Sequence, residues 1–162
     1  MHLLPIVQGL ILVFAANGAP VLAHWMFRER GAFALDFGAR FSDGGPLFGS
    51  AKTIRGVIAS LIAASLTALL LGLSWQVGAL AGAAAMAGDL LSSFIKRRLG
   101  LPPHSMAPGL DQGPECVFPL VACMSALGLT VSDVLLATLV FWIGELLISR
   151  ALFSLKIREH PY

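Results

Sequence analysis

The chain has 162 residues, of which 57% are hydrophobic and 12% charged, and its formal net charge is +2. Soluble domains carry about 25% charged residues, so this composition, with a mean hydropathy of +0.82, indicates an integral membrane protein. The small net charge gives no support to nucleic-acid binding. We expect an all-α helical bundle of about five transmembrane helices with two cytoplasmic polar loops, forming one domain over residues 1–162.

Five apolar segments approach the length of about 20 residues that a membrane-spanning helix needs. They are, roughly, residues 3–27, 54–73, 76–95, 116–129 and 131–155. The fourth is short and is also consistent with a re-entrant or buried segment. The first contains Asn17 and Pro20, and a proline inside a span frees a backbone carbonyl that a ligand can use.

Small side chains are concentrated in the third segment, where glycine and alanine dominate. Such residues allow close helix contact, either within the chain or in a dimer, so the oligomeric state stays open. Cys116 and Cys123 are seven residues apart, which on a helix separates them too far for a disulfide. We expect both to be packing residues.

Two polar segments, 36–56 and 88–115, interrupt the apolar pattern. With the N-terminus outside, these loops and the C-terminal tail share one side, on or near which all eleven Lys and Arg residues fall. The turns at 73–75 and 128–133 contain none. The positive-inside rule therefore predicts a multi-pass protein of the cell membrane whose polar segments face the cytoplasm, where nucleoside triphosphates are available.

The first polar segment ends with Lys52, Thr53 and Arg55, where the second apolar helix is expected to begin. A helix N-terminus offers free N–H groups and a positive dipole end. Together with the ammonium, hydroxyl and guanidinium groups, this position suits a polyphosphate. The alternative is that Lys52 and Arg55 only anchor the helix at the lipid headgroups.

The second polar segment begins inside the third apolar helix. Its polar residues recur at steps of three or four and therefore share one helical face; they are Asp89, Ser92, Ser93, Lys96 and Arg97. A carboxylate at the depth of Asp89 needs a cation, a metal or a water-filled cavity. The alternative is an internal salt bridge with the basic triplet as a flank of the span.

The remaining ionisable residues give weaker indications. Glu145 lies midway along the fifth apolar segment, where a structural role and a substrate-lining role are equally open. None of the four histidines has metal-ligand spacing to another histidine or to a cysteine, so we do not expect a zinc site.

Four short strings, taken in order and spacing, resemble the CDP-archaeol synthases, which are related to the CDP-diacylglycerol synthases. The strings are Asn17-x-x-Pro20; Asp43-Gly44 with Phe48-Gly49-x-x-Lys52-Thr53-x-Arg55-Gly56; Gly88-Asp89-x-x-x-Ser93-Phe94-Ile95-Lys96-Arg97-Arg98; and Asp111-Gln112. Each string is short, and their occurrence in series is what makes the resemblance specific.

The resemblance implies a CTP-dependent cytidylyltransferase that makes a CDP-lipid and pyrophosphate. Its lipid substrate would be an isoprenoid glycerol ether phosphate or a related glycerolipid phosphate. Asp89 and Asp111 would hold Mg²⁺ through oxygen ligands and, with Lys96 and Lys52, form the catalytic set. The residues implied in substrate binding are Lys52, Thr53, Arg55, Ser93, Lys96, Arg97, Asn17 and Asp43.

Three other functions stay open at this point. Asp36-x-x-Ala39-Arg40 resembles the opening of the CDP-alcohol phosphotransferase motif, but the expected continuation Gly-x-x-x-Asp-x-x-x-Asp is missing. Asp89 and Glu145 would permit a small transporter or channel. A non-catalytic membrane scaffold is the last alternative.

Overall fold

The computed structural model describes residues 2–102, 105, 107 and 109–156. These residues form six helices and no extended strand. The helices are α1 (Leu3–Phe27), α2 (Ile54–Leu70), α3 (Trp75–Arg98), α4 (Gln112–Ala122), α5 (Met124–Leu127) and α6 (Val131–Ser154). The prediction of an all-α membrane bundle is confirmed.

The number of helices differs from the five that the hydropathy pattern predicts. Within the described residues, α1, α3 and the first 21 residues of α6 are long and apolar enough to cross a membrane, and α2 is apolar but has 17 residues. The predicted fourth span is not a continuous helix, because α4 ends at Ala122 and Cys123 separates it from α5. This arrangement fits the alternative of a buried segment. Both cysteines are free and buried, as expected.

Side-chain caps define the starts of two helices. The hydroxyl of Thr53 accepts a hydrogen bond from the N–H of Gly56 and fixes the first turn of α2. At α6, Thr130 and Asp133 form a reciprocal capping box, in which each satisfies a backbone N–H of the other. The carboxylate of Asp133 also pairs with the imidazole of His2 at 3.0 Å and thereby ties the start of α1 to the start of α6.

Glycines on α3 allow two neighbouring helices to approach its backbone. A methyl group at Gly78 would lie 2.3 Å from the carbonyl oxygen of Ala64 on α2. A methyl group at Gly88 would lie 2.2 Å from the carbonyl oxygen of Pro114 on α4. The small residues of the third segment therefore serve contacts within the chain, which was one of the two alternatives drawn from the sequence.

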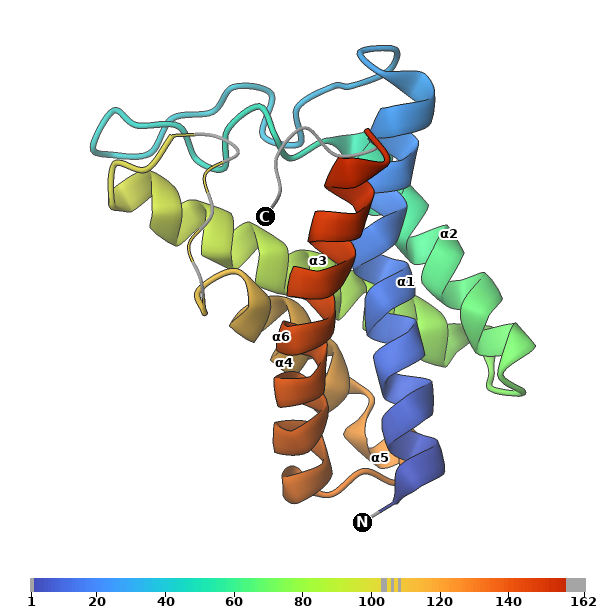
Figure 1. The fold of residues 1–162 in the computed structure, drawn as a ribbon. Helices are drawn as coiled ribbons and strands as arrows, with labels where there is room; N and C mark the ends of the chain where they lie inside the picture. The colour runs from blue at the N-terminus through green and yellow to red at the C-terminus, as the bar shows by residue number, and fades with distance from the viewer. Residues whose placement is uncertain (1, 103–104, 106, 108, 157–162) are drawn as a thin grey trace.

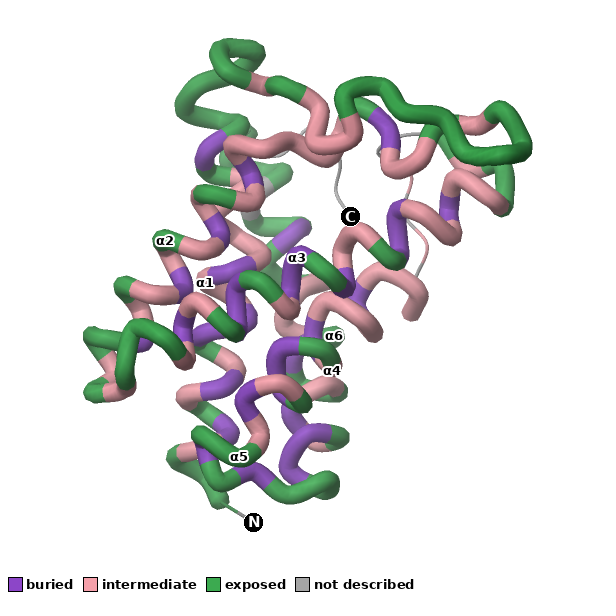
Figure 2. Tube along the Cα trace, turned by 180° about the vertical axis from the view of Figure 1, so that it is seen from behind, coloured by how far each residue is buried: buried purple, intermediate pink, exposed green. Residues whose placement is uncertain are grey.

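Apolar side chains face both the centre of the bundle and its outer surface. Leu12, Leu120 and Phe141 are fully buried at the centre, where the ring of Phe141 lies 4.9 Å from that of Phe14. Large exposed side chains follow one face of α2 (Ile58, Ile62, Leu66, Leu69) and one face of α6 (Leu135, Leu139, Ile143, Leu147). Buried residues gather where helices meet, and exposed residues follow the outer surface (Figure 2). Outward apolar faces of this kind suit contact with lipid.

The polar loops lie at the same end of the molecule. In Figure 1, the loop between α1 and α2 and the C-terminal end of α3 lie at the end opposite the N-terminus. The helix α3 runs obliquely across the bundle, and α2 and α4 both pack closely against it. Residues from the two polar segments are thereby brought to a common region.

Candidate functional site

The loop between α1 and α2 is held in shape by its own backbone and one carboxylate. Leu35 donates its N–H to the carbonyl of Lys52 at 2.7 Å. The carboxylate of Asp36 accepts hydrogen bonds from the N–H groups of Phe48, Gly49 and Gly38. Burial alone would raise the pKa of Asp36, but these three bonds stabilise the carboxylate and lower its pKa below the ordinary value.

Arg55 fastens the base of this loop. Its guanidinium donates hydrogen bonds to the backbone carbonyls of Arg28 and Arg30 and lies 5.9 Å from the ring centroid of Phe27. The sequence analysis predicted that Arg55 and Thr53 bind phosphate. In the structure, Arg55 ties the loop to the end of α1 and the hydroxyl of Thr53 caps α2.

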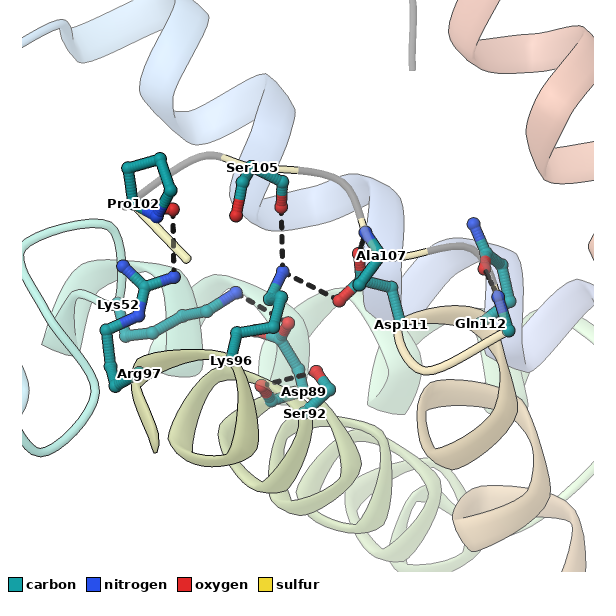
Figure 3. Close-up of polar contacts among 11 residues, drawn as sticks. Lys52, Asp89, Ser92, Lys96, Arg97, Pro102, Ser105, Ala107, Asp111 and Gln112 are labelled. Atoms are coloured by element: carbon teal, nitrogen blue, oxygen red, sulfur yellow. Dashed lines mark hydrogen bonds and ion pairs between the residues drawn. The ribbon is translucent and has the colours of Figure 1, made fainter. Parts of the chain in front are cut away.

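Two lysines pair with two carboxylates beside the C-terminal half of α3, which the charge distribution predicts to face the cytoplasm (Figure 3). The Nζ atom of Lys52 lies 2.5 Å from Oδ1 of Asp89, and Nζ of Lys96 lies 2.6 Å from Oδ1 of Asp111. All four side chains are at most 22% exposed. The structure therefore brings together the four residues predicted to be catalytic, although Asp89 and Asp111 each face a lysine.

Glu115, at the start of α4, joins this group through Asp89. The carboxyl group of Glu115 lies close enough to that of Asp89 for the two side chains to interact directly. Gly88 makes this contact sterically possible, since it lets the α4 backbone reach α3. Glu145 on α6 acts electrostatically on Glu115, so it too faces the group. Asn17 donates a hydrogen bond of 3.4 Å to the backbone carbonyl of Glu115.

The electrostatics keep Lys52 charged. Burial alone would lower the pKa of Lys52, but the carboxylates of Asp89, Glu115 and Asp111 outweigh this effect and hold its pKa above the ordinary value. An ammonium group is therefore maintained beside three carboxyl groups.

Backbone carbonyls of the second loop cover the other cations of α3 (Figure 3). Lys96 donates to the carbonyl of Ser105, and Arg97 donates to the carbonyl of Pro102, each at 3.0 Å. Asp111 accepts a hydrogen bond from the N–H of Ala107 at 2.8 Å. Carbonyls are weaker partners for these cations than phosphate oxygens, so a phosphorylated ligand can displace them.

The remaining predicted residues, Ser93 and Asp43, are not members of the two ion pairs. Ser93 is buried within the bundle. Asp43 lies on the first loop, where its carboxylate is 3.0 Å from the guanidinium of Arg98. The resemblance implied a substrate-binding role for Asp43, and in the structure its carboxylate contacts a cation.

Two residues with defined contacts were not selected from the sequence. Glu115 stands in the second polar segment, but its approach to Asp89 depends on the close crossing of α3 and α4. Arg98 was read only as part of a basic triplet, yet it binds the tip of the first loop. The sequence showed only that both segments are polar. The spacing of the residues did not reveal that Glu115 approaches Asp89 or that Arg98 contacts the first loop.

Fold and site together define an all-helical membrane protein with a cluster of alternating cations and carboxylates at one end. A family model described as "CarS-like: CDP-archaeol synthase" matches residues 73–162, which is more than half of the chain. The chain therefore belongs to the CDP-archaeol synthase family.

Individual relatives agree with this assignment. A CDP-archaeol synthase of Pyrobaculum calidifontis is 32% identical over 97% of this chain and 98% of its own length. That of Pyrococcus furiosus is 36% identical over 69% of this chain and 70% of its own length. The relative from Hyperthermus butylicus is 39% identical, and the match spans 65% of this chain and 64% of the relative, just under two thirds.

A solved structure shares the fold. It is that of an intramembrane enzyme for archaeal membrane lipid biosynthesis, with a TM-score of 0.74 and 31% sequence identity. The match covers 88% of this chain and 90% of the other. The likeness therefore extends over most of the chain.

Proposed function

We propose that the protein is a CTP-dependent cytidylyltransferase that acts on a lipid phosphate within the membrane. The observation that carries this proposal is the meeting of Lys52 and Lys96, from separate segments, with the carboxylates of Asp89 and Asp111. CTP and a lipid phosphate together carry many negative charges, and a site for both needs several cations. Family membership supports this function among the four that the sequence left open.

In the proposed reaction, an oxygen of the lipid phosphate attacks the α-phosphorus of CTP. The new P–O bond joins the lipid phosphate to the CMP unit, and the bond to the β-phosphate breaks so that pyrophosphate leaves with the bonding electrons. A phosphate dianion is already a nucleophile, so the site needs no dedicated base. Positioning and neutralisation of charge then supply most of the catalysis.

The ion pairs give the site cations that can change partner. We assign Lys52, Lys96 and Arg97 to the phosphate oxygens of CTP and the lipid. In the structure, Lys52 and Lys96 pair with Asp89 and Asp111, and Arg97 donates to a loop carbonyl. Thr53 and Arg55 contribute by shaping the loop that presents Lys52.

The carboxyl groups suit Mg²⁺, and we propose Asp89 and Asp111 as its ligands, with Glu115 beside Asp89. Asp89 and Glu115 place two carboxyl groups side by side, and a divalent cation would relieve the repulsion between them when both are ionised. Among the described residues, no group of three or more His, Cys, Asp or Glu side chains is arranged to hold a metal. Mg²⁺ commonly takes only one or two carboxylates and completes its shell with water and phosphate oxygens. When bound, the ion would neutralise charge on the phosphates.

The proposed site faces the cytoplasm, because the basic residues of the chain cluster at the end of the molecule that carries it. The lipid phosphate would reach it from the inner leaflet, and CTP from the cytosol. We propose that the lipid is an isoprenoid glycerol ether phosphate or a related glycerolipid phosphate.

The direct test is pyrophosphate release by purified protein supplied with CTP, Mg²⁺ and a lipid phosphate. We expect Asp89→Ala and Asp111→Ala each to lower turnover by about 100-fold or more, because each removes a proposed ligand. Glu29→Ala, which removes an exposed acid from the first loop, is the matched control and should keep full turnover. Full activity in both site variants would refute the site, and no pyrophosphate with either ether or ester lipids would refute the function.

A further inference from the structure

The last residue of α3, Arg98, binds the tip of the first loop through three kinds of contact. Its guanidinium lies 3.0 Å from the carboxylate of Asp43 and donates a hydrogen bond of 2.5 Å to the carbonyl of Pro46. It also lies 5.0 Å and 5.1 Å from the ring centroids of Phe41 and Phe94. The two rings pack edge to face at 5.2 Å, so one side chain joins the loop and α3.

The loop is continuous in hydrogen bonding from this tip to Lys52. Near the tip, Phe41 donates its N–H to the carbonyl of Gly45 at 2.9 Å. Closer to the base, Asp36 holds the segment around Phe48 and Gly49, as described above. The carbonyl of Gly49 then accepts the N–H of Lys52 at 3.3 Å. A displacement of the tip is therefore transmitted to the backbone that presents Lys52.

We propose that Arg98 is a positioning residue that anchors the first loop on α3 and so fixes Lys52 against Asp89. This inference rests on the proposed function, since it assumes that Lys52 contacts phosphate. Arg98 acts at a distance: its contacts are with Asp43, Pro46 and the two rings, while Lys52 lies at the base of the loop. Arginine suits this role because its planar group stacks on rings and donates from several N–H groups at once, which lysine cannot reproduce.

Kinetics give the first test, with Arg40 as the matched control. Arg40 lies on the same loop, but its guanidinium donates a hydrogen bond to the carbonyl of Gly44 within the loop. We expect Arg98→Ala to lower kcat by about tenfold, with a smaller change in KM, because misplaced catalytic groups slow the chemical step. Arg40→Ala should stay within about twofold of the parent. Unchanged kcat and KM in Arg98→Ala would overturn the proposal.

Hydrogen exchange gives a second test that does not depend on activity. The amides of residues 34–50 should exchange at least about tenfold faster in Arg98→Ala than in the parent protein, both in detergent and without substrate. Arg40→Ala should change exchange only near residue 44. If the parent protein makes no CDP-lipid, the proposed function is refuted, but the exchange measurement still tests whether Arg98 anchors the first loop. Equal exchange in the parent and in Arg98→Ala would overturn the anchor alone.

A third variant separates anchoring from direct contact between Arg98 and substrate. If Arg98 bound phosphate itself, Asp43→Asn would release its guanidinium and lower KM for CTP. If Arg98 anchors the loop, Asp43→Asn weakens the anchor, lowers kcat and speeds hydrogen exchange over residues 34–50.

Arg98→Lys keeps the positive charge and replaces Arg98→Ala as the test variant if Arg98→Ala does not fold. It should show the same loss in milder form, and full parent kinetics in Arg98→Lys would contradict the need for a planar group.

Discussion

The carboxylate of Asp89 interacts with several neighbouring charged side chains. Lys52 forms an ion pair with it, the carboxyl group of Glu115 lies beside it, and Lys96 attracts it from about two turns further along α3. Because removing one partner of a buried ion pair leaves an uncompensated charge, such a site is sensitive to single substitutions. The strongest effects at the residue scale are therefore expected at this carboxylate and its lysine.

The raised pKa of Lys52 leads to a prediction about stability and pH. A lysine whose pKa is higher in the folded protein stabilises the fold at every pH below its unfolded pKa of about 10.4. This stabilisation is lost as pH rises through the higher folded value. Lys52→Met should therefore cost about 3 kcal/mol of unfolding free energy, and the difference from the parent should stay constant between about pH 7 and pH 9.

Denaturant unfolding in detergent at several pH values measures this difference. Lys156→Met is the control, because Lys156 is exposed at the end of α6 and should leave the unfolding free energy nearly unchanged. A cost for Lys52→Met that shrinks steadily from about pH 7 to pH 9 would show that Lys52 loses its proton in that range.

At the scale of elements, the crossing of α3 and α4 determines whether the site is complete. Gly88 is the point of closest approach, and the atoms that a side chain would meet there belong to the backbone of Pro114 and Glu115. A backbone cannot rotate out of the way as a flexible side chain can. The position of Glu115 therefore depends on the absence of a side chain one residue before Asp89.

Gly88→Ala tests this dependence. We expect it to destabilise the protein by about 1–3 kcal/mol through overpacking and to lower turnover, because α4 must move away from α3. Gly113→Ala is the matched control, since a methyl group there meets no atom within 4 Å. Thermal unfolding and pyrophosphate release measure both variants, and equal behaviour of the two would rule out a tight crossing.

The helices were predictable because hydropathy depends on local composition. The polar face of α3 was predictable for the same reason, since Asp89, Ser92 and Lys96 recur with helical spacing. The break at Cys123 was not predicted, because the apolar pattern continues through it from α4 into α5.

The contacts of the site were harder to predict than its residues. Lys52 and Asp89 were both selected, but their pairing requires the path of the first loop, which hydrogen bonds of Asp36 and Arg55 determine. Arg55 was expected to bind phosphate because its residue type and position suit it. In the structure its guanidinium is engaged by carbonyls at the end of α1, which periodicity does not reveal.

For the whole molecule, the distribution of charge predicts an orientation. The loop between α1 and α2 and the end of α3 lie opposite the N-terminus and the turn before α6 (Figure 1). The basic residues cluster on the loop side, which the positive-inside rule assigns to the cytoplasm. Under the proposed function, CTP would then reach the site without crossing the membrane.

Thiol labelling tests this orientation in intact cells. Phe37→Cys places a thiol on the first loop and Ser132→Cys places one at the opposite end, both at exposed positions. The native cysteines are buried and serve as the background control. A membrane-impermeant reagent should label Ser132→Cys in intact cells and Phe37→Cys only after permeabilisation. The reverse pattern would place the site outside.

The short second helix has a consequence for the surrounding lipid. A helix of 17 residues rises about 26 Å, which is less than the hydrocarbon thickness of about 30 Å. Hydrophobic mismatch of this kind is met by local thinning of the bilayer. Under the proposed function and orientation, the inner headgroups beside α2 would then be drawn toward the membrane centre, which would shorten the distance that a lipid phosphate must travel to reach Lys52.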